Sequence, residues 1–521
     1  MLASVTILDS IKVPLLLART LPIRVSWSQP LISQSLRLAA TQSLLRTQAY
    51  IDGKWTAASS GSSFPVYNPS TNKEIANVAD CNADDVDKAV KAASKAFEKF
   101  SQTSAKERST LLRNLFDLHN KHHKELAELL TLENGKPLRE SLGEIVYGAS
   151  FLDWFAEEAK RIYGDIVPAS TPDREILAIK QPIGVAGIIT PWNFPNAMIT
   201  RKIGAALAIG CTVVVKPAQD TPLSALAIAD LAEQAGYPPG VINVLPASQT
   251  NTPSVGTAMA THPDMHALSF TGSTAIGKLL LGQCASTVKK VSLELGGNAP
   301  FIVFDSADID RAIQGLMAAK FRNTGQTCVS ANRIFVQSGV YEQFIEKLSA
   351  TMNSQLKVGD GFSEHTTCGP LINAKAVEKV MQHLQDIKTK GGRVVLQGTT
   401  RGNFIDPIIA ADITPDMQVC HEETFGPLVA IIRFNTEEEV LKAANNTEVG
   451  LAGYFYSQDV AQIFRVAKKL QVGMVGVNEG LISAAQAPFG GIKQSGIGRE
   501  GSRYGVDEYA EIKYICLGGL A

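Results

Sequence analysis

The strongest constraint on the fold is a regular alternation between short apolar runs and segments with helical periodicity. Apolar runs rich in β-branched residues occupy residues 183–189 and 212–215, and further strands are predicted at 241–245 and 267–270. Helix-like segments with short loops separate these runs. Because parallel strands need a crossover connection, usually a helix, this pattern predicts a parallel sheet covered by helices.

The alternation starts again after Gly297, with a strand predicted at residues 301–304 and a helix at 309–320. It continues as far as an apolar run at 473–477. A chain of 521 residues is also too long for one hydrophobic core. We therefore expect two α/β domains that meet near Gly296 and Gly297. Upstream of both, residues 83–99 and 105–134 are each expected to be helical.

Composition excludes several classes of protein. The net charge of −1 offers no long-range field for a polyanion, so we expect no nucleic-acid partner. The sequence contains no apolar run of about 18 residues, so we expect no membrane-spanning helix. The seven cysteines are odd in number and form no C-x-x-C pair, which argues against a disulfide framework or a zinc site. His119, His122 and His123 have helical spacing, but the neighbouring Lys121 and Lys124 indicate a solvated face, so we expect no metal.

The first 47 residues differ from the rest of the chain. They carry five basic residues against one acid, Asp9, and many serines among leucines. Composition of this kind is typical of a mitochondrial transit peptide, which would send the protein to the mitochondrial matrix. A secretory signal is disfavoured because the apolar run 13–18 is short and Pro14 interrupts it. A tail without function is the alternative.

Two segments carry candidate chemistry. Cys328 ends the polar stretch 321–328, between a predicted helix and a predicted strand, where a nucleophile would be exposed but rigidly held. Glu294 ends an apolar run thirty-four residues upstream and is followed by Gly296 and Gly297. A thiol and a carboxylate base are the minimum apparatus for a thioester mechanism.

Taken together, these segments resemble the aldehyde dehydrogenase family, and the resemblance runs from about Tyr50 to the C-terminus. It implies that Cys328 is the nucleophile and that Glu294 activates the hydrolytic water. It also implies that Asn193, in the segment Thr190-Pro191-Trp192-Asn193-Phe194-Pro195, donates to the oxyanion together with the Cys328 backbone N–H. In isolation we would interpret this residue as a capping asparagine.

The resemblance also implies a nicotinamide cofactor. The segment 270–278 lies at a predicted strand-to-helix junction, where glycines and free N–H groups favour a pyrophosphate. Its spacing mimics a P-loop, but Leu279 stands where a magnesium-binding hydroxyl is required. The cofactor-binding residues expected from the family are Pro191, Trp192, Lys216, Gln219, Gly272, Ser273, Glu423 and Phe425. Gln219 replaces the glutamate usual in NAD-dependent members, so we expect NAD with appreciable use of NADP.

Three further positions indicate the substrate. Arg201, Arg322 and Ser483 match the residues that grip the distal carboxylate in family members acting on succinate semialdehyde, and an arginine fork suits a carboxylate. Surface or interdomain salt bridges are the alternative. The expected reaction is oxidation of succinate semialdehyde to succinate, in 4-aminobutyrate degradation. Glutarate semialdehyde is an alternative substrate, and a non-catalytic cofactor-binding or structural member of the fold is an alternative of another class.

The resemblance to the family also implies the domain boundaries of this chain. We expect a Rossmann-like dinucleotide-binding domain at 48–160 and 183–294 and an α/β catalytic domain at 295–499. We expect a small β oligomerisation arm at 161–182 and 500–521, which would give a homo-oligomer, either a dimer or a tetramer. Some mitochondrial relatives have a second cysteine two residues after the nucleophile. Ser330 stands there in this chain, so no local disulfide switch is expected.

Overall fold

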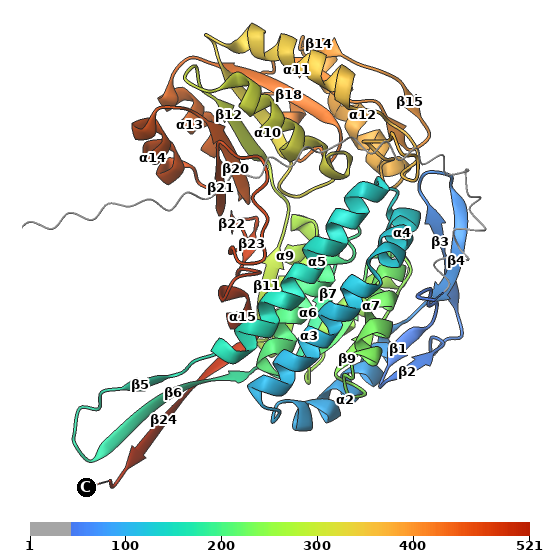
Figure 1. Cartoon of the computed structure of the whole chain (residues 1–521), viewed down its shortest axis with the longest axis vertical. Helices are drawn as coiled ribbons and strands as arrows, with labels where there is room; N and C mark the ends of the chain where they lie inside the picture. The colour runs from blue at the N-terminus through green and yellow to red at the C-terminus, as the bar shows by residue number, and fades with distance from the viewer. Residues whose placement is uncertain (1–42, 521) are drawn as a thin grey trace, which may run out of the picture. The chain divides into compact units, whose positions relative to one another are not determined.

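The computed structural model describes residues 43–520 (Figure 1). The expected leader therefore lies mostly outside the described residues. The last residues of the expected leader are described by the structure. Leu44 is 1% exposed, and the Arg46 guanidinium donates to Asp230 at 3.1 Å. Residues 44–47, assigned above to the leader, thus pack against the folded body, and the folded region begins earlier than expected. The physical reason is that Leu44 is apolar and finds a buried site.

Eight strands form the first sheet of the described chain. Their order is β2 (Lys54–Thr56), β1 (Ala49–Ile51), β9 (Ile242–Val244), β8 (Thr212–Lys216), β7 (Val185–Ile189), β10 (Ala267–Thr271), β11 (Lys290–Glu294) and β23 (Gly496–Ile497). The five strands from β9 to β11 run parallel. The strand β23 pairs antiparallel with β11, so residues 496–497 belong to this sheet although we expected them in the catalytic domain.

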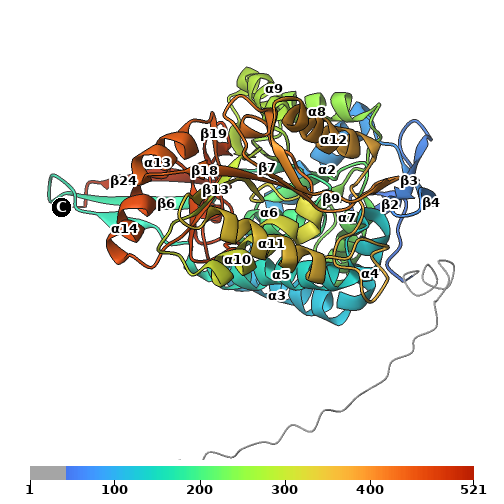
Figure 2. The same ribbon diagram turned by 90° about the horizontal axis from the view of Figure 1, so that it is seen from above.

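Helices cover both faces of this sheet (Figure 2). On one face lie α2 (Ala83–Phe100), α8 (Thr252–Thr261) and α9 (Thr274–Cys284), and on the other α6 (Ala197–Ile209) and α7 (Leu223–Gln234). Beyond α6 and α7 lie α3 (Ala105–Lys121), α4 (His123–Asn134) and α5 (Leu138–Glu158). The helical structure expected at 105–134 is confirmed, but it is divided into two helices that meet at His122.

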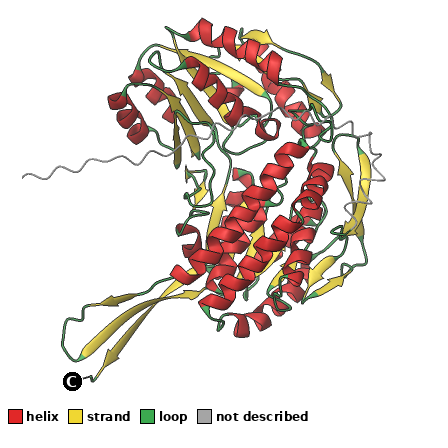
Figure 3. Ribbon diagram, viewed as in Figure 1, coloured by secondary structure: helices red, strands yellow, loops and turns green. Residues whose placement is uncertain are grey.

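The second sheet has seven strands within the described residues. Their order is β14 (Arg393–Leu396), β17 (Ile408–Ala411), β18 (Leu428–Phe434), β13 (Ala331–Gln337), β12 (Ala299–Val303), β20 (Ala452–Tyr456) and β21 (Met474–Val477). All neighbours are parallel except β14 and β17. The helices of this half are α10 (Ile309–Phe321), α11 (Tyr341–Gln355), α12 (Ala374–Thr389), α13 (Glu437–Asn445) and α14 (Val460–Lys469). This α/β architecture confirms the predicted fold class (Figure 3).

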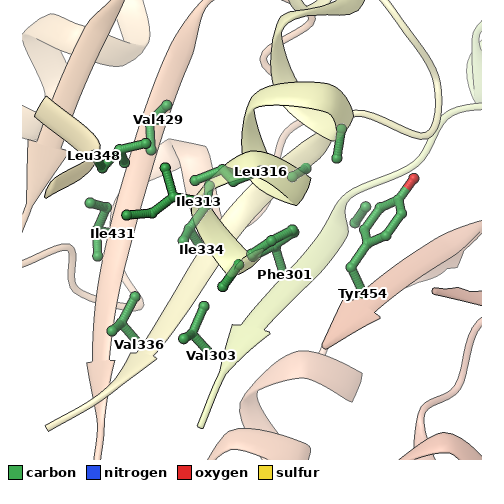
Figure 4. Packing of buried hydrophobic residues seen from close by; sticks show 14 of the residues in the cluster. Phe301, Val303, Ile313, Leu316, Ile334, Val336, Leu348, Val429, Ile431 and Tyr454 are labelled. Carbon is green, nitrogen blue, oxygen red and sulfur yellow. The ribbon is translucent and has the colours of Figure 1, made fainter. Parts of the chain in front are cut away.

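The cores of the second half show why its strands are apolar on both faces. Successive strand residues point to opposite sides, so Phe301 and Val303 pack against Ile313 and Leu316 of α10 (Figure 4). Their neighbour Ile302 belongs instead to the cluster beneath α13 and α14. Each such side chain contributes about 1.5–3 kcal/mol when buried.

A three-stranded sheet forms the arm. It consists of β5 (Asp165–Val167), β6 (Arg174–Pro182) and β24 (Ala510–Gly518), with β24 antiparallel to β6 from Ala510↔Pro182 to Gly518↔Arg174. The C-terminal part of the predicted arm begins with the short helix α15 (Tyr504–Asp507), which contacts α6 and precedes β24. Smaller pairs are β3 (Ser63–Asn68) with β4 (Lys73–Ala79), β15 (Thr400–Arg401) with β16 (Phe404–Ile405), and β19 (Val449–Gly450) with β22 (Ile492–Lys493).

Candidate active site

The carboxyl edge of the first sheet carries polar side chains after four adjacent parallel strands. Asn193 follows β7, Lys216 ends β8, Ser273 follows β10 and Glu294 ends β11. The chain order reverses at β7, which lies between β8 and β10. Ligands of open α/β sheets bind outside the carboxyl ends of the strands at such a reversal. The structure therefore gathers these four predicted residues at one edge.

The amino edge of the second sheet faces this site. Cys328 lies three residues before β13, and Phe425 lies three residues before the neighbouring strand β18. The Phe425 ring packs edge-on against Trp192, with ring centroids 5.6 Å apart. The backbone N–H of Gly297, after β11, lies 3.4 Å from the Glu423 carboxylate. The two sheet edges thus meet around one site.

Cys328 is held in a tightly turned segment. Asn323 and Thr324, just upstream, both have left-handed backbone, with φ of 50° and 56°. This conformation is an outlier for a β-branched residue such as Thr324, and the surrounding contacts must hold it. The carbonyl oxygen of Cys328 lies against Gly297, where an added Cβ would come within 2.6 Å. Gly297 therefore lets the loop after Glu294 approach the cysteine.

The thiol of Cys328 is half-buried, and its charge state depends on residues from both halves. Burial raises its pKa to about 12. The guanidinium groups of Arg201 and Arg322 act against this rise, whereas the carboxyl groups of Glu423 and Glu294 add to it. The two arginines therefore stabilise the thiolate, which is the reactive form.

Asn193 lies beside the cysteine loop. Its side-chain amide donates to the carbonyl of Gln326 at 3.0 Å, two residues before Cys328. An NH₂ group has two donors, so one remains for a ligand. The side-chain oxygen of Asn193 is buried and has no hydrogen-bond partner among the described residues. This geometry allows the residue to donate toward an oxygen bound near Cys328.

Glu294 is 2% exposed, and neither carboxylate oxygen has a hydrogen-bond partner among residues 43–520. Burial raises its pKa well above the usual range, and the neighbouring Glu500 adds to the rise. Arg201, Lys202 and Arg499 act in the opposite direction. A buried carboxyl group with spare acceptor capacity suits a general base that waits for a water molecule.

The expected cofactor residues occupy the carboxyl edge and its surroundings. The Lys216 ammonium is 3% exposed and donates to the neighbouring Pro217 carbonyl at 3.0 Å; burial lowers its pKa to about 8. Ser273 caps α9, and Gly272 donates its N–H to the Glu294 carbonyl. Burial raises the pKa of Glu423 to about 7. Gln219 lines a separate pocket together with Ser248, Thr250 and Asn373, while Pro191 lies between β7 and Trp192.

The three expected substrate residues separate into two environments. Arg322 and Ser483 line one small pocket together with Thr327 and Val329, which flank Cys328 in sequence. The Arg322 guanidinium also lies 4.9 Å from the centre of the Phe194 ring.

Arg201 is not among the residues lining that pocket. It is 1% exposed, forms an ion pair with Glu500, and lies 4.4 Å from the centre of the Phe489 ring. Both of its terminal nitrogens lack a hydrogen-bond partner in the described chain. Arg201 thus forms a buried ion pair and keeps two unpartnered nitrogens, so its role in substrate binding stays a prediction.

Sequence reasoning missed two buried groups at this site. Glu500 forms ion pairs with both Arg201 and Lys202, and Lys136 donates to the backbone carbonyl of Asn193. Glu500 lies 298 residues from Lys202, and no local pattern links them. For Lys136, the one available signal was its spacing to Glu140 and Glu144, which follow it by four and by eight residues.

Metal and membrane features can be stated for the described part of the chain. Residues 43–520 contain no group of three or more His, Cys, Asp or Glu side chains that could hold a metal ion. None of their helices has the length and apolar character needed to cross a bilayer.

Comparison with known proteins gives consistent matches. The model of the aldehyde dehydrogenase family matches residues 55–515. The chain is 57% identical to mitochondrial succinate-semialdehyde dehydrogenase of Rattus norvegicus, covering 92% of this chain and 91% of that protein. It is 56% identical to the Homo sapiens protein of that name (93% and 91% covered) and 53% identical to glutarate-semialdehyde dehydrogenase of Pseudomonas aeruginosa (92% and 99%).

Solved structures agree with these matches. An NADP-dependent enzyme of E. coli superposes with a TM-score of 0.90 at 53% identity, covering 92% of this chain and 99% of that one. Succinate-semialdehyde dehydrogenase of Burkholderia pseudomallei gives 0.90 at 51% identity, with 91% and 98% covered. Betaine aldehyde dehydrogenase of Staphylococcus aureus, in complex with NAD⁺, gives 0.89 at 34% identity, with 93% and 97% covered.

Proposed function

This chain belongs to the aldehyde dehydrogenase family, and we propose that it oxidises succinate semialdehyde to succinate through a thioester on Cys328. The observation that carries the substrate assignment is the pocket shared by Arg322 and Ser483. A guanidinium and a hydroxyl are suitable donors for the distal carboxylate of the substrate, and Thr327 and Val329 of the same pocket flank the nucleophile. The named relatives at 56–57% identity support this choice.

The carboxyl edge of the first sheet fits a nicotinamide dinucleotide. Lys216 is buried and Glu423 is half-buried, and both have hydrogen-bonding capacity to spare. Ser273 begins a helix whose first N–H groups suit a pyrophosphate. We assign Lys216 and Gln219 to the adenosine ribose, Gly272 and Ser273 to the pyrophosphate, and Glu423 to the nicotinamide ribose. Phe425, Trp192 and Pro191 would pack around the nicotinamide end. When bound, the cofactor supplies the hydride acceptor.

The residues of the chain then have distinct tasks. The Cys328 thiolate attacks the aldehyde carbon, while the Asn193 amide and the Cys328 backbone N–H donate to the developing oxyanion. Once the thiohemiacetal carbon has been oxidised, the acyl group is held on Cys328 as a thioester. Glu294 accepts a proton from the water that hydrolyses it. Because burial favours the protonated form of Glu294, this last step should accelerate as pH rises.

Glutarate semialdehyde is a second candidate substrate, since a relative of that name is 53% identical. It differs from succinate semialdehyde by one methylene group, and a pocket discriminates such a difference by only about 1–3 kcal/mol. A non-catalytic role is disfavoured because Cys328, Glu294 and Asn193 are all present and gathered together.

Initial rates with succinate semialdehyde and butanal test the proposal. The two aldehydes have the same chain length, and only one carries a carboxylate. We expect kcat/KM to favour the semialdehyde by about 10²-fold, which corresponds to about 2.7 kcal/mol. Arg322→Leu should remove most of this preference. Arg201→Leu should slow both substrates, because it removes one of the two cations paired with the buried Glu500 and leaves only Lys202. Equal rates with the two aldehydes would reject the assignment to semialdehydes.

We also propose location in the mitochondrial matrix, in 4-aminobutyrate degradation, after removal of a leader. The packing of Leu44 and Arg46 favours cleavage upstream of Ser43. N-terminal sequencing of the mitochondrial protein checks this: a mature end at Gln48 would contradict it.

A homo-oligomer, a dimer or tetramer, is supported by the arm. Ile166, Ile512 and Tyr514 expose 77%, 73% and 64% of their surface there, and apolar clusters of this kind mark contact surfaces. Light scattering of a variant with Ile512→Lys tests it, since loss of the oligomer is expected and an unchanged mass would argue against arm contacts.

A further inference from the structure

A buried lysine lies beneath the segment that carries Asn193. Lys136 is 1% exposed and sits between α4 and α5. Its ammonium donates to the Glu144 carboxylate at 2.6 Å and to the backbone carbonyl of Asn193 at 2.6 Å. It also lies 3.9 Å from the centre of the Phe194 ring. A buried ammonium is costly unless it is paired and hydrogen-bonded, so these contacts together hold Lys136 in place.

The carboxylate of Glu144, which pairs with Lys136, also contacts the C-terminal end of the segment that carries Asn193. One oxygen of Glu144 accepts from Lys136, and the other accepts from the backbone N–H groups of Asn196 at 3.0 Å and Ala197 at 3.3 Å. These N–H groups belong to the start of α6, which has no side-chain cap of its own. A carboxylate is well placed at a helix N-terminus. The Lys136–Glu144 pair therefore fixes the Asn193 segment at both ends.

The same side of α5 also reaches the cysteine loop. Glu140 accepts from the backbone N–H of Asn323 at 2.6 Å, and the Asn323 side chain donates to the Asn193 carbonyl at 2.9 Å. Glu140 and Glu144 are four residues apart and so share one face of the helix. The left-handed turn before Cys328 and the Asn193 segment are thus held by charges from one short stretch of chain.

Asn193 needs such support. Its side chain makes one hydrogen bond, to the Gln326 carbonyl, and its side-chain oxygen has no partner among the described residues. The side chain is therefore not oriented by its own contacts alone, and its direction depends on where the backbone is placed. A displacement of about 1 Å in a catalytic group can cost about 10²-fold in rate.

We propose that Lys136, together with Glu144, is a positioning residue that aims the Asn193 amide at the oxyanion formed on Cys328. This inference rests on the proposed function, because it assigns Lys136 a role in that reaction. Lys136 does not touch the reacting atoms. It acts through its hydrogen bond to the backbone carbonyl of Asn193, whose side chain donates to the oxyanion.

A double-mutant cycle with Asn193 tests this role. Lys136→Met should lower kcat/KM for succinate semialdehyde by about 10²-fold in the wild-type background. It should cost little more in the Asn193→Ala background, because the group it positions is then missing. Affinity for NAD⁺, measured by fluorescence titration, should not change. Additive losses, or wild-type rates in Lys136→Met, would overturn the proposal.

Two further variants separate positioning from loss of folding. Lys136→Met leaves Glu144 buried and unpaired, so Lys136→Met/Glu144→Gln removes both charges and should fold while remaining slow. Lys289 is a matched control, since it is also buried and donates to two backbone carbonyls, those of His262 and Met265, at 2.9 Å. Lys289→Met should retain wild-type kcat. An equal loss of rate in Lys289→Met would show that removal of any buried lysine has this effect.

Amide hydrogen exchange distinguishes failure of this inference from failure of the proposed function. Peptides spanning 190–198 and 320–328 should exchange faster in Lys136→Met than in wild type or Lys289→Met. If the wild-type protein turns over no aldehyde, the proposed function fails. In that case the rates of amide hydrogen exchange in the two peptides still test whether Lys136 holds these segments in place. Faster exchange in both peptides would support the positioning contacts, and unchanged exchange would refute them.

Discussion

The two sheet edges that meet at the site hold their side chains in different ways. At the carboxyl edge of the first sheet, Lys216 and Glu294 are the last residues of regular parallel strands and take their positions from the ladder of backbone hydrogen bonds. At the amino edge of the second sheet, Thr324 and Phe425 lie in turns before a strand, with φ of 56° and 55°. Strain of this kind persists only where surrounding contacts impose it. The position of Glu294 is therefore set by regular strand structure. The position of Cys328 is set by a loop that buried charged groups such as Glu140 hold in place.

The largest expected effect lies at the amino edge. Cys328→Ala removes the proposed nucleophile, so we expect NADH formation with succinate semialdehyde to fall by about 10⁴-fold or more. Cys516→Ala, at an exposed cysteine on the arm, is the matched control and should keep the wild-type rate. If Cys328→Ala retained substantial turnover, the assignment of the nucleophile would be wrong.

A smaller effect with a different kinetic signature is expected at the carboxyl edge. Glu294→Gln keeps the shape of the side chain but removes the proposed base, so steady-state turnover should fall by about 10²–10⁴-fold. The first turnover should remain fast, because the nucleophile is intact. Rapid-mixing measurements should show a burst of NADH, and intact-mass measurements should show an acylated protein. Loss of the burst would place Glu294 before acylation instead.

Electrostatic coupling between the edges predicts a pH dependence. Burial raises the pKa of the Cys328 thiol to about 12, so alkylation by iodoacetamide should rise by about tenfold per pH unit between pH 7 and 9. The negative charge of Glu294 raises the thiol pKa, but that charge forms only above the raised pKa of Glu294.

Glu294→Gln should therefore alkylate at the wild-type rate at low pH, where Glu294 is protonated and neutral. It should alkylate faster than wild type at high pH. A constant ratio across the whole pH range would argue that the two edges are not coupled electrically.

The smallest effect concerns cofactor choice at the carboxyl edge. Gln219→Glu adds a negative charge where we place the adenosine ribose, and this charge would repel a 2′-phosphate. We expect kcat/KM with NADP⁺ to fall by about tenfold while the value with NAD⁺ changes little, as expected for discrimination by repulsion. Gln219→Asn is the uncharged control. An equal decrease with both cofactors would place Gln219 away from the ribose.

Much of the fold could be predicted from the sequence, because strands and helices leave periodic patterns. The predicted strand at 212–215 and helix at 309–320 correspond to β8 (Thr212–Lys216) and α10 (Ile309–Phe321). Boundaries were less accurate where tertiary contacts decide them, as at His122, which divides α3 from α4, and at β23, which returns to the first sheet.

The sequence by itself determined the two parallel sheets and indicated the thiol and the carboxylate, since each lies next to a strand or helix with a readable pattern. The Asn193 amide was indicated only by the resemblance of its segment to the family. Only the tertiary structure decided what surrounds them. It paired Arg201 with Glu500, separated Arg201 from the pocket of Arg322 and Ser483, and placed Lys136 beneath Asn193. Such contacts join residues far apart in the chain, and their strength depends on burial, which no local pattern records.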